Sequence, residues 1–337
     1  MLSGATHKIN RAIQSQHGTA HTATLIIGEA QHMHNLPKVI LDTDIGDDID
    51  DSFALLLLLE SKAFDVLGVT TVFRNAEKRA HMAKELIDSL GYDVKVYPGE
   101  DFPIKSKIED LIEPKIKAKE VLDEKGKYLI PQWSESMRNH KIEQENAVDF
   151  IIEQVNKYPG EVTLITIGPM TNVARALEKD PSIESKIKEV RIMGGGIGLP
   201  WPEWNVFCDP EAAHKIYYSN IKKITQVGCN VTMQTGLSPE DVEDLKNNKS
   251  KTIALVYDAM MKWFKHYEFT TPVMHDPLTV ASLLKPEILT IEKMHVEIDL
   301  VKRGFMSQVE DGGAYVDVAT AVDKKGFFTL FKKVLNI

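Results

Sequence analysis

The chain has 337 residues, of which 43% are hydrophobic, and a formal net charge of −9 at pH 7. This length allows one large domain or two smaller ones, and the composition is ordinary for a globular protein. The negative charge argues against a nucleic acid or an anionic membrane surface as partner, whereas a small neutral ligand is compatible with it.

Residues 1–36 differ from the rest of the chain. They contain five of the eleven histidines and many Gln, Thr and Ala residues, with little periodic apolar pattern. The segment has no long apolar core, which argues against a signal peptide, although a histidine-rich tract can bind metals. We interpret residues 1–36 as an N-terminal extension of unknown role and residues 37–337 as the folded domain.

The most informative stretch runs from Val39 to Asp51, where three apolar residues lead directly into six aspartates around one glycine. Residues 52–59 are apolar again and helical in character. The pattern predicts a buried strand, an acidic turn and a helix, and open α/β sheets bind ligands at the carboxyl ends of their strands. Because the run itself contains no lysine or arginine to balance these carboxylates, we expect a hard divalent cation, calcium before magnesium. The alternative is a solvated loop in which Asp50 or Asp51 only caps the helix.

The rest of the chain alternates strands and helices. Repeated β-α units with nearly continuous apolar strands predict one large α/β domain with an open, mostly parallel, Rossmann-like sheet and helices on both faces. The Lys/Glu-rich segment 100–128 is expected to be a surface excursion. Strands are expected at residues 66–73, 94–97, 161–167, 190–193 and 224–227, and helices at 77–90, 146–158, 173–178, from 209, at 251–266, from 275, and at 326–335.

Cys208 and Cys229 are the two cysteines of the chain. They are too few for a disulfide framework and fit a reducing compartment, so we expect a cytoplasmic protein. The longest apolar run, residues 53–59, is far too short to cross a bilayer.

The acidic stretch resembles a family signature. Asp42–Gly46 followed by Ile49–Asp51 is similar to the DxDPGxDD motif that opens the inosine-uridine preferring nucleoside hydrolases. Here Ile replaces Pro, and Asp47 and Asp48 are two extra residues. Further segments resemble the same family in the same order, so the resemblance spans roughly residues 38–335. They are Asn75, with Arg74 where the family has Gly; the GPLTN-like turn 168–172; the MGG…EFN…DPEAA-like residues 193–213; and His275-Asp276.

The resemblance implies a calcium-dependent nucleoside N-ribohydrolase, which cleaves a ribonucleoside into ribose and free base. It implies that Asp44, Asp51, Asp276 and the main-chain carbonyl of Ile167 hold the calcium ion. The ion would chelate the ribose 2′- and 3′-hydroxyls and acidify a water, whose proton Asp44 would take.

The resemblance also assigns the substrate contacts. Asp50, Asn75, Glu203 and Asn205 would bind ribose hydroxyls, and His275 would protonate the leaving base. The substrate would be a small-molecule nucleoside, and the protein a homodimer or a homotetramer.

Two other classes remain open from the residues alone. Asp42–Asp44 also fits the DxD start of a magnesium-dependent phosphatase of the haloacid dehalogenase type, which predicts Thr or Val at the position of Gly46. The other class is a non-catalytic, calcium-dependent protein that binds a nucleoside or ribose. The presence of both Asp51 and His275 argues against this second class.

Two local patterns have simpler explanations. His275-Asp276-Pro277 alone is a common helix start, in which Asp276 acts as the cap. Trp263, Phe264 and Tyr267 either form a wall of the base site or belong to the core, as aromatic residues at helical spacing commonly do.

Overall fold

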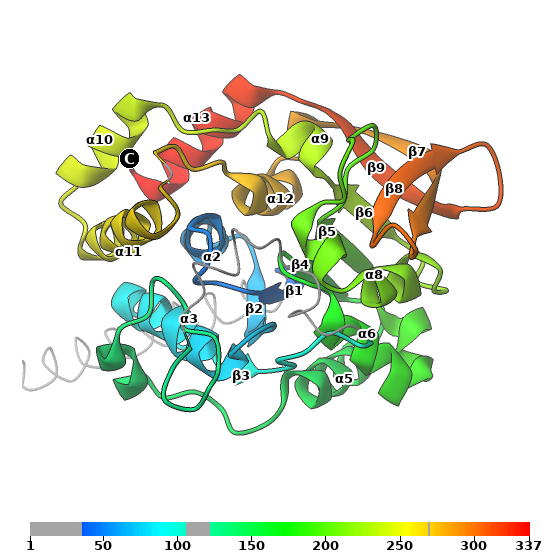
Figure 1. Ribbon diagram of the computed structural model, residues 1–337, viewed down its shortest axis with the longest axis horizontal. Helices are drawn as coiled ribbons and strands as arrows, with labels where there is room; N and C mark the ends of the chain where they lie inside the picture. Colours follow the sequence, from blue (N-terminus) through cyan, green and yellow to red (C-terminus); the bar gives the residue numbers. More distant parts are fainter. Residues whose placement is uncertain (1–35, 106–121, 269) are drawn as a thin grey trace, which may run out of the picture. The chain divides into compact units, whose positions relative to one another are not determined.

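The computed structural model describes residues 36–105, 122–268 and 270–337, and the chain from Lys38 to Ile337 forms one compact unit (Figure 1). The extension proposed at residues 1–36 therefore lies almost wholly outside the described residues, as does much of the excursion expected at 100–128. Within the described ranges, no helix is long and apolar enough to cross a membrane.

Nine strands form a single sheet. Its parallel part contains every strand that the sequence pattern predicted, so the open, mostly parallel sheet is confirmed. The strands are β1 (Lys38–Thr43), β2 (Asp65–Thr71), β3 (Val96–Pro98), β4 (Val162–Thr166), β5 (Glu189–Met193), β6 (Ile224–Val227), β7 (Leu289–Asp299), β8 (Phe305–Val309) and β9 (Ala314–Val322).

The strand order is β3-β2-β1-β4-β5-β6-β9-β7-β8. Strands β1 to β6 pair in parallel with their neighbours, and β9 continues this parallel arrangement beside β6. Strand β7 is antiparallel to both β9 and β8. The sequence analysis did not predict these last three strands, which extend the sheet beyond its parallel part.

Helices cover both faces of the sheet, as expected. Val39 and Leu41 of β1 pack into one apolar cluster with α2, α3, α11, α12 and α13, whereas Ile40 packs into a second cluster with α5, α6 and α8 (Figure 1). The helices are α2 (Asp50–Glu60), α3 (Ala76–Leu90), α5 (Ala147–Lys157), α6 (Thr171–Lys179), α7 (Trp204–Cys208), α8 (Pro210–Tyr217), α9 (Cys229–Thr232), α10 (Pro239–Asn247), α11 (Lys251–Tyr267), α12 (His275–Leu284) and α13 (Lys324–Leu335), with short 3-10 turns η2 (Glu135–Asn139), η3 (Pro181–Lys186) and η4 (Pro286–Ile288).

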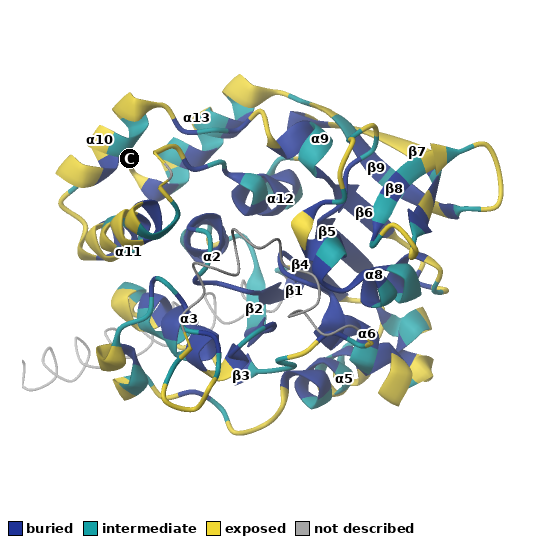
Figure 2. Ribbon diagram, in the orientation of Figure 1, coloured by how far each residue is buried: buried dark blue, intermediate teal, exposed yellow. Residues whose placement is uncertain are grey.

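Helix α2 is buried along most of its length, which explains why its sequence is a continuous apolar run rather than a stripe. Figure 2 shows α2 and the central strands as buried, whereas α10 and α11 carry exposed faces. Because α2 begins directly after the acidic turn, this burial anchors the aspartates at its N-terminus to the core of the domain.

Residues with clear capping roles mark the ends of three helices. Gly91 ends α3 with φ 77°, and its N–H donates to the carbonyls of Asp88 and Ile87. Asn146 caps α5 by accepting a hydrogen bond from a main-chain N–H. Helix α8 begins at Pro210, which suits the first turn of a helix because proline has no N–H to satisfy.

Candidate active site

A cavity of about 510 Å³ lies at the carboxyl ends of the parallel strands. Its walls include residues at the carboxyl ends of β1, β2, β4, β5 and β6, or just after them. Open α/β sheets bind their ligands at these strand ends. The lining residues are Asp44, Asp47, Asp48, Asp50, Asp51, Arg74, Tyr128, Ile167, Met193, Trp201, Pro202, Glu203, Trp204, Asn205, Cys229, Met233, Trp263, Tyr267, His275 and Asp276.

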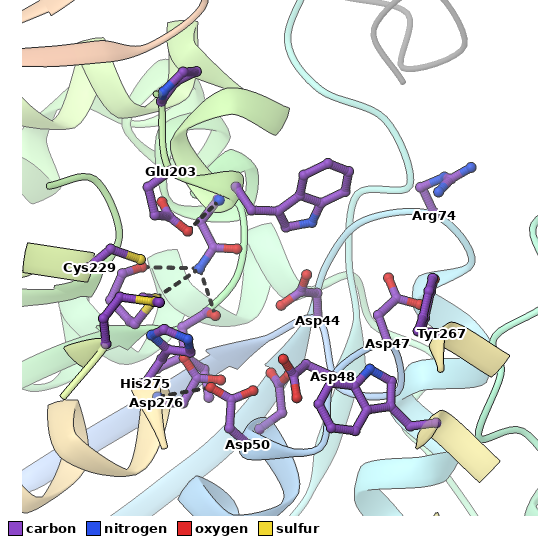
Figure 3. Close-up of a pocket in the computed structure, with 18 of the residues that line it drawn as sticks. Asp44, Asp47, Asp48, Asp50, Arg74, Glu203, Cys229, Tyr267, His275 and Asp276 are labelled. Atoms are coloured by element: carbon purple, nitrogen blue, oxygen red, sulfur yellow. Dashed lines mark hydrogen bonds between the residues drawn. The ribbon is translucent and has the colours of Figure 1, made fainter. Parts of the chain in front are cut away.

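Three buried carboxylates converge at the bottom of this cavity. Asp50 and Asp51 are the first two residues of α2, and Asp276 is the second residue of α12. One oxygen from each lies within 4.8 Å of the other two, and the Asp276 N–H donates to Asp50 Oδ2 at 3.2 Å (Figure 3). The positive ends of two helix dipoles therefore face this concentration of negative charge and partly offset it.

Helix capping does not account for these aspartates. The N-cap of α2 is Ile49 and that of α12 is Met274, and neither makes a side-chain capping bond within the described chain. The carboxylates of Asp50, Asp51 and Asp276 instead face the cavity. Asp51 and Asp276 are therefore not used as helix caps, whereas Asp50 accepts a hydrogen bond from the first turn of α12.

Asp44 follows β1 and faces the same cavity beside the three carboxylates. Its carboxylate packs against Gly168, where an added Cβ would lie 2.7 Å from Asp44 Oδ1 and 2.9 Å from the Asp44 main-chain nitrogen. A side chain is also excluded at Gly46. Its φ of 123° is unfavourable for any other residue, and an added Cβ would lie 2.4 Å from Ile130 Cγ2. Glycines thus set the shape of the acidic turn and the place of Asp44.

Burial and mutual repulsion raise the pKa values of these carboxyl groups. Burial is the largest cause for Asp44, Asp50 and Asp276, whose pKa values lie well above the ordinary value, and neighbouring aspartates add to the effect. Burial likewise raises the pKa of Asp51 to about 7 and that of Asp48 to about 7. The nearby Arg79 guanidinium acts in the opposite direction on the pKa values of Asp44 and Asp51, and a bound cation would favour the charged carboxylates further.

A second polar group lies on the opposite wall. Glu203 is the N-cap of α7 and accepts hydrogen bonds from the main-chain N–H groups of Gly195 and Asn205, each at 2.8 Å. Asn205 Nδ2 donates to the carbonyl of Ile167 at 3.0 Å and to that of Met193 at 3.1 Å. Burial raises the pKa of Glu203 to about 6. Asn205 thus connects the wall to the carbonyl of Ile167.

His275 is the first residue of α12 and lies beside Asp276 (Figure 3). Its Nδ1 is 2.6 Å from the hydroxyl of Thr232, so the other ring nitrogen, Nε2, is left to face a ligand. Burial lowers the pKa of His275 to about 4, and the imidazole is therefore neutral at pH 7.

Asn75 is the one predicted site residue that does not line the cavity. Its Nδ2 donates to the carbonyl of Tyr128 at 3.1 Å and to Asp123 Oδ2 at 3.3 Å. The preceding residue, Arg74, lines the cavity instead, with its guanidinium 4.0 Å from the ring centroid of Tyr128. Phe73, Arg74 and Asn75 have φ values of 72°, 42° and 77°, so this turn is a run of strained left-handed residues.

Several lining residues were not predicted from the sequence. Trp201, Trp204 and Met233 form an exposed apolar rim, and no spacing pattern separates them from ordinary surface residues. Trp263 and Tyr267 line the cavity as one interpretation proposed, whereas Phe264 packs into the core. Another residue that the sequence analysis missed, Arg79, lies behind the acidic turn and makes no part of the cavity wall.

We expect Gly168→Ala to lower kcat/KM by at least about 10-fold while the protein stays folded, because misplacing a reacting group by about 1 Å can cost on the order of 10²-fold. An alanine Cβ would displace the Asp44 carboxylate, and no positive φ forbids alanine at this position. Gly236→Ala is a matched control, because its added Cβ would meet side-chain atoms only at 4.0 Å. Wild-type kinetics in Gly168→Ala would show that Asp44 tolerates the shift.

A ligand crevice at strand ends, walled by carboxylates, an imidazole and aromatic rings, defines an α/β enzyme for a small molecule. Comparison with protein families specifies the kind of enzyme, since residues 39–329 match the model of the inosine-uridine preferring nucleoside hydrolases. The chain belongs to this family, and its reaction is hydrolysis of the N-glycosidic bond of ribonucleosides. The alternative classes, a phosphatase and a non-catalytic binding protein, are thereby set aside.

Individual relatives agree with this assignment. The chain is 32% identical to uridine nucleosidase 1 of Arabidopsis thaliana, with 88% of this chain and 93% of the relative covered. It is 29% identical to the pyrimidine-specific ribonucleoside hydrolase RihB of Escherichia coli, with 78% and 83% covered.

Solved structures of the family have the same fold. A plant nucleoside hydrolase aligns with a TM-score of 0.73 at 28% identity and covers 89% of this chain and 98% of its own. The purine-preferring ribonucleoside hydrolase of Gardnerella vaginalis aligns with a TM-score of 0.72 at 28% identity, covering 88% and 98%.

Proposed function

We propose that the cavity binds one calcium ion through Asp44, Asp51, Asp276 and the main-chain carbonyl of Ile167. All four ligands are hard oxygen donors of the kind that calcium prefers, and all four line the same cavity. The observation that carries the proposal is the close approach of the buried Asp51, Asp276 and Asp50 carboxylates, whose oxygens lie within 4.8 Å of one another. When bound, the ion would supply Lewis acidity to a water and to the ribose hydroxyls.

The side chains around the proposed ion have separate roles. Asp44 accepts the proton of the attacking water, since it lies at the edge of the carboxylate group. Asp50, Glu203 and Asn205 bind ribose hydroxyls from opposite sides of the cavity. Asn75 reaches the ribose only if the strained turn at residues 73–75 rearranges, because its amide now donates to the carbonyl of Tyr128.

His275 assists departure of the base in this proposal. In the free protein its ring is neutral, and Thr232 engages Nδ1 at 2.6 Å. To act as an acid, His275 takes up a solvent proton in the nucleoside complex; as the N-glycosidic bond breaks, negative charge develops on the base, which receives the Nε2 proton and leaves the ring neutral again. Trp263 and Tyr267 line the same cavity and are candidates to contact the base.

Release of free base from a panel of purine and pyrimidine ribonucleosides, with calcium and with a chelator, tests the proposal. We propose uridine as a substrate because Arabidopsis and rice relatives carry the name uridine nucleosidase. The expected result is turnover that a chelator abolishes and added calcium restores. Turnover that is unchanged after complete metal removal would overturn the calcium site without touching the family assignment.

Nucleoside 5′-monophosphates are expected to be poor substrates, with kcat/KM at least about 10-fold below that of the parent nucleoside. A phosphate on the 5′ side would face Glu203 in a protein of net charge −9, and like-charge contacts cost several kcal/mol. Paired assays of uridine and uridine monophosphate measure the ratio. Equal kcat/KM values would contradict the placement of Glu203 beside the 5′ group.

The proposal extends to location and assembly. Cys208 and Cys229 are free thiols, which supports a cytoplasmic location where thiols stay reduced. We propose a homodimer or a homotetramer, and light scattering coupled to size-exclusion chromatography distinguishes these two assemblies from a monomer.

A further inference from the structure

Arg79 of α3 is completely buried, and its guanidinium binds oxygen atoms of two separate loops. In the acidic turn, Nη1 donates to the carbonyls of Asp44 and Ile45, the latter at 3.0 Å, and Nη2 donates to Asp47 Oδ2 at 3.0 Å. In the turn after β2, Nε donates to the carbonyl of Phe73 at 2.7 Å. We call this set of contacts the Arg79 clamp.

The two loops that the clamp joins carry different parts of the active site. The acidic turn contains Asp44, whose carboxylate faces the cavity. The turn after β2 contains Arg74, which lines the cavity as the turn now stands, and Asn75, which would reach the ribose only after this turn rearranges. Both turns lie at the carboxyl ends of adjacent parallel strands, so a single side chain behind them can set the distance between them.

The Arg79 clamp also stabilises two otherwise unfavourable features of these turns, the carboxylate of Asp47 and the strained backbone at residues 73–75. Asp47 is one of the two residues inserted relative to the family signature, and a carboxylate at this place needs a partner. The turn at residues 73–75 has three positive φ values, and such strain persists only where neighbouring contacts enforce it. Here Arg79 holds the Phe73 carbonyl, while the Phe73 N–H donates to Glu100 O at 2.7 Å and the Arg74 N–H to Asp101 O at 2.8 Å.

We propose that Arg79 is a positioning residue that couples the metal ligand Asp44 to the substrate-binding turn at residues 73–75. The inference rests on the proposed calcium site. Without touching ion or substrate, the guanidinium holds the acidic turn through its carbonyls and holds the second turn through Phe73. Loss of the clamp therefore affects calcium affinity and nucleoside binding together.

Arg79→Met tests this coupling, because methionine fills much of the space and donates no hydrogen bond. Calorimetry should show calcium affinity reduced by about 10- to 100-fold, the range seen when partners of metal ligands are removed. At saturating calcium, KM for the nucleoside should stay raised by at least about 10-fold. A residue that merely stabilised the fold would change neither quantity in the folded fraction.

The matched control is Arg191→Met. Arg191 is also buried in an ion pair, with Glu189 at 2.6 Å, but it does not line the cavity, and it donates a hydrogen bond to Ser282 near the C-terminal end of α12. This variant should lose stability while it keeps wild-type calcium affinity and KM. Melting temperatures of both variants separate stability from binding.

Arg79→Lys keeps the test decisive if Arg79→Met does not fold. A lysine can pair with Asp47 but cannot bind the Phe73 carbonyl at the same time, so KM should rise while the melting temperature changes less. Wild-type calcium affinity and KM in either folded variant would overturn the coupling. If the wild-type protein binds no calcium, the proposed metal site fails instead, and that result is distinct.

Discussion

Asp276→Ala and Asp51→Ala are each expected to abolish stoichiometric calcium binding and to reduce turnover of ribonucleosides by about 10³-fold. Each substitution removes a charged ligand from a buried cluster whose oxygens lie within 4.8 Å of one another. A bound metal ion is worth several kcal/mol of transition-state stabilisation, and each 1.36 kcal/mol corresponds to a factor of ten in rate. Elemental analysis of the purified variants measures the calcium directly.

Asp209→Ala is the matched control for these two variants. Asp209 is equally buried, but it caps α8 and accepts a hydrogen bond from Thr171 at 2.6 Å, away from the cavity lining. Its loss should lower the melting temperature, because removing an N-cap costs about 1 kcal/mol. The calcium content should remain at the wild-type level. Full calcium in both Asp51→Ala and Asp276→Ala would remove the proposed ligand set.

His275→Ala should lower kcat on uridine or inosine by about 10²- to 10⁴-fold, the usual range for general acid assistance. The same variant should retain much of its activity on a nitrophenyl riboside, because nitrophenolate leaves without a proton. The comparison separates the two roles open to His275. If His275 only braced Asp276, both substrates would lose activity in parallel at saturating calcium.

Thr232→Val provides an intermediate case for the same measurement. It removes the hydroxyl that lies 2.6 Å from Nδ1 of His275 and leaves the ring in place. The nucleoside reaction should therefore fall by less than in His275→Ala, and the nitrophenyl riboside should be almost unaffected. A nucleoside rate that equals the wild type would show that the orientation of the ring does not depend on Thr232.

Much of the parallel sheet was predictable because its strands are covered on both faces. Val39, Ile40 and Leu41 are all buried, so their continuous apolar character predicts a central strand. The last strands, β7 to β9, are not continuously apolar. In β7, for example, exposed residues such as Glu292 lie among buried ones. Their mixed pattern is weaker in sequence, and their pairing depends on contacts between strands that are distant along the chain.

The active site was predictable where its residues come from strand ends and helix starts. The acidic turn that contains Asp44 and Asp51 stood out because its carboxylates directly follow an apolar run, whereas Asp276 was assigned only through the resemblance of His275-Asp276 to the family. The Arg79 clamp was missed although Arg79 stands in the first turn of α3, because the acidic turn that it binds is 35 positions away and no local pattern connects the two. A signal for it existed, since Arg79 occupies the buried stripe of α3 together with Ala83 and Ile87, at a spacing of four residues. Asn75 was expected in the site but does not line the cavity, because the orientation of its side chain depends on a turn whose conformation the sequence does not specify.

The proposed ligands of the calcium ion come from parts of the chain that are far apart. Asp50, the neighbour of the proposed ligand Asp51, accepts a hydrogen bond from the main-chain N–H of the proposed ligand Asp276, although 226 positions separate the two residues. A nascent chain therefore lacks a complete site until α12 has been synthesised and has docked beside α2. Bound metal would close a loop of this length, so calcium would act as a late, reversible cross-link between the two ends of the domain. Calcium uptake during refolding would accordingly report completion of the whole domain rather than formation of any one element.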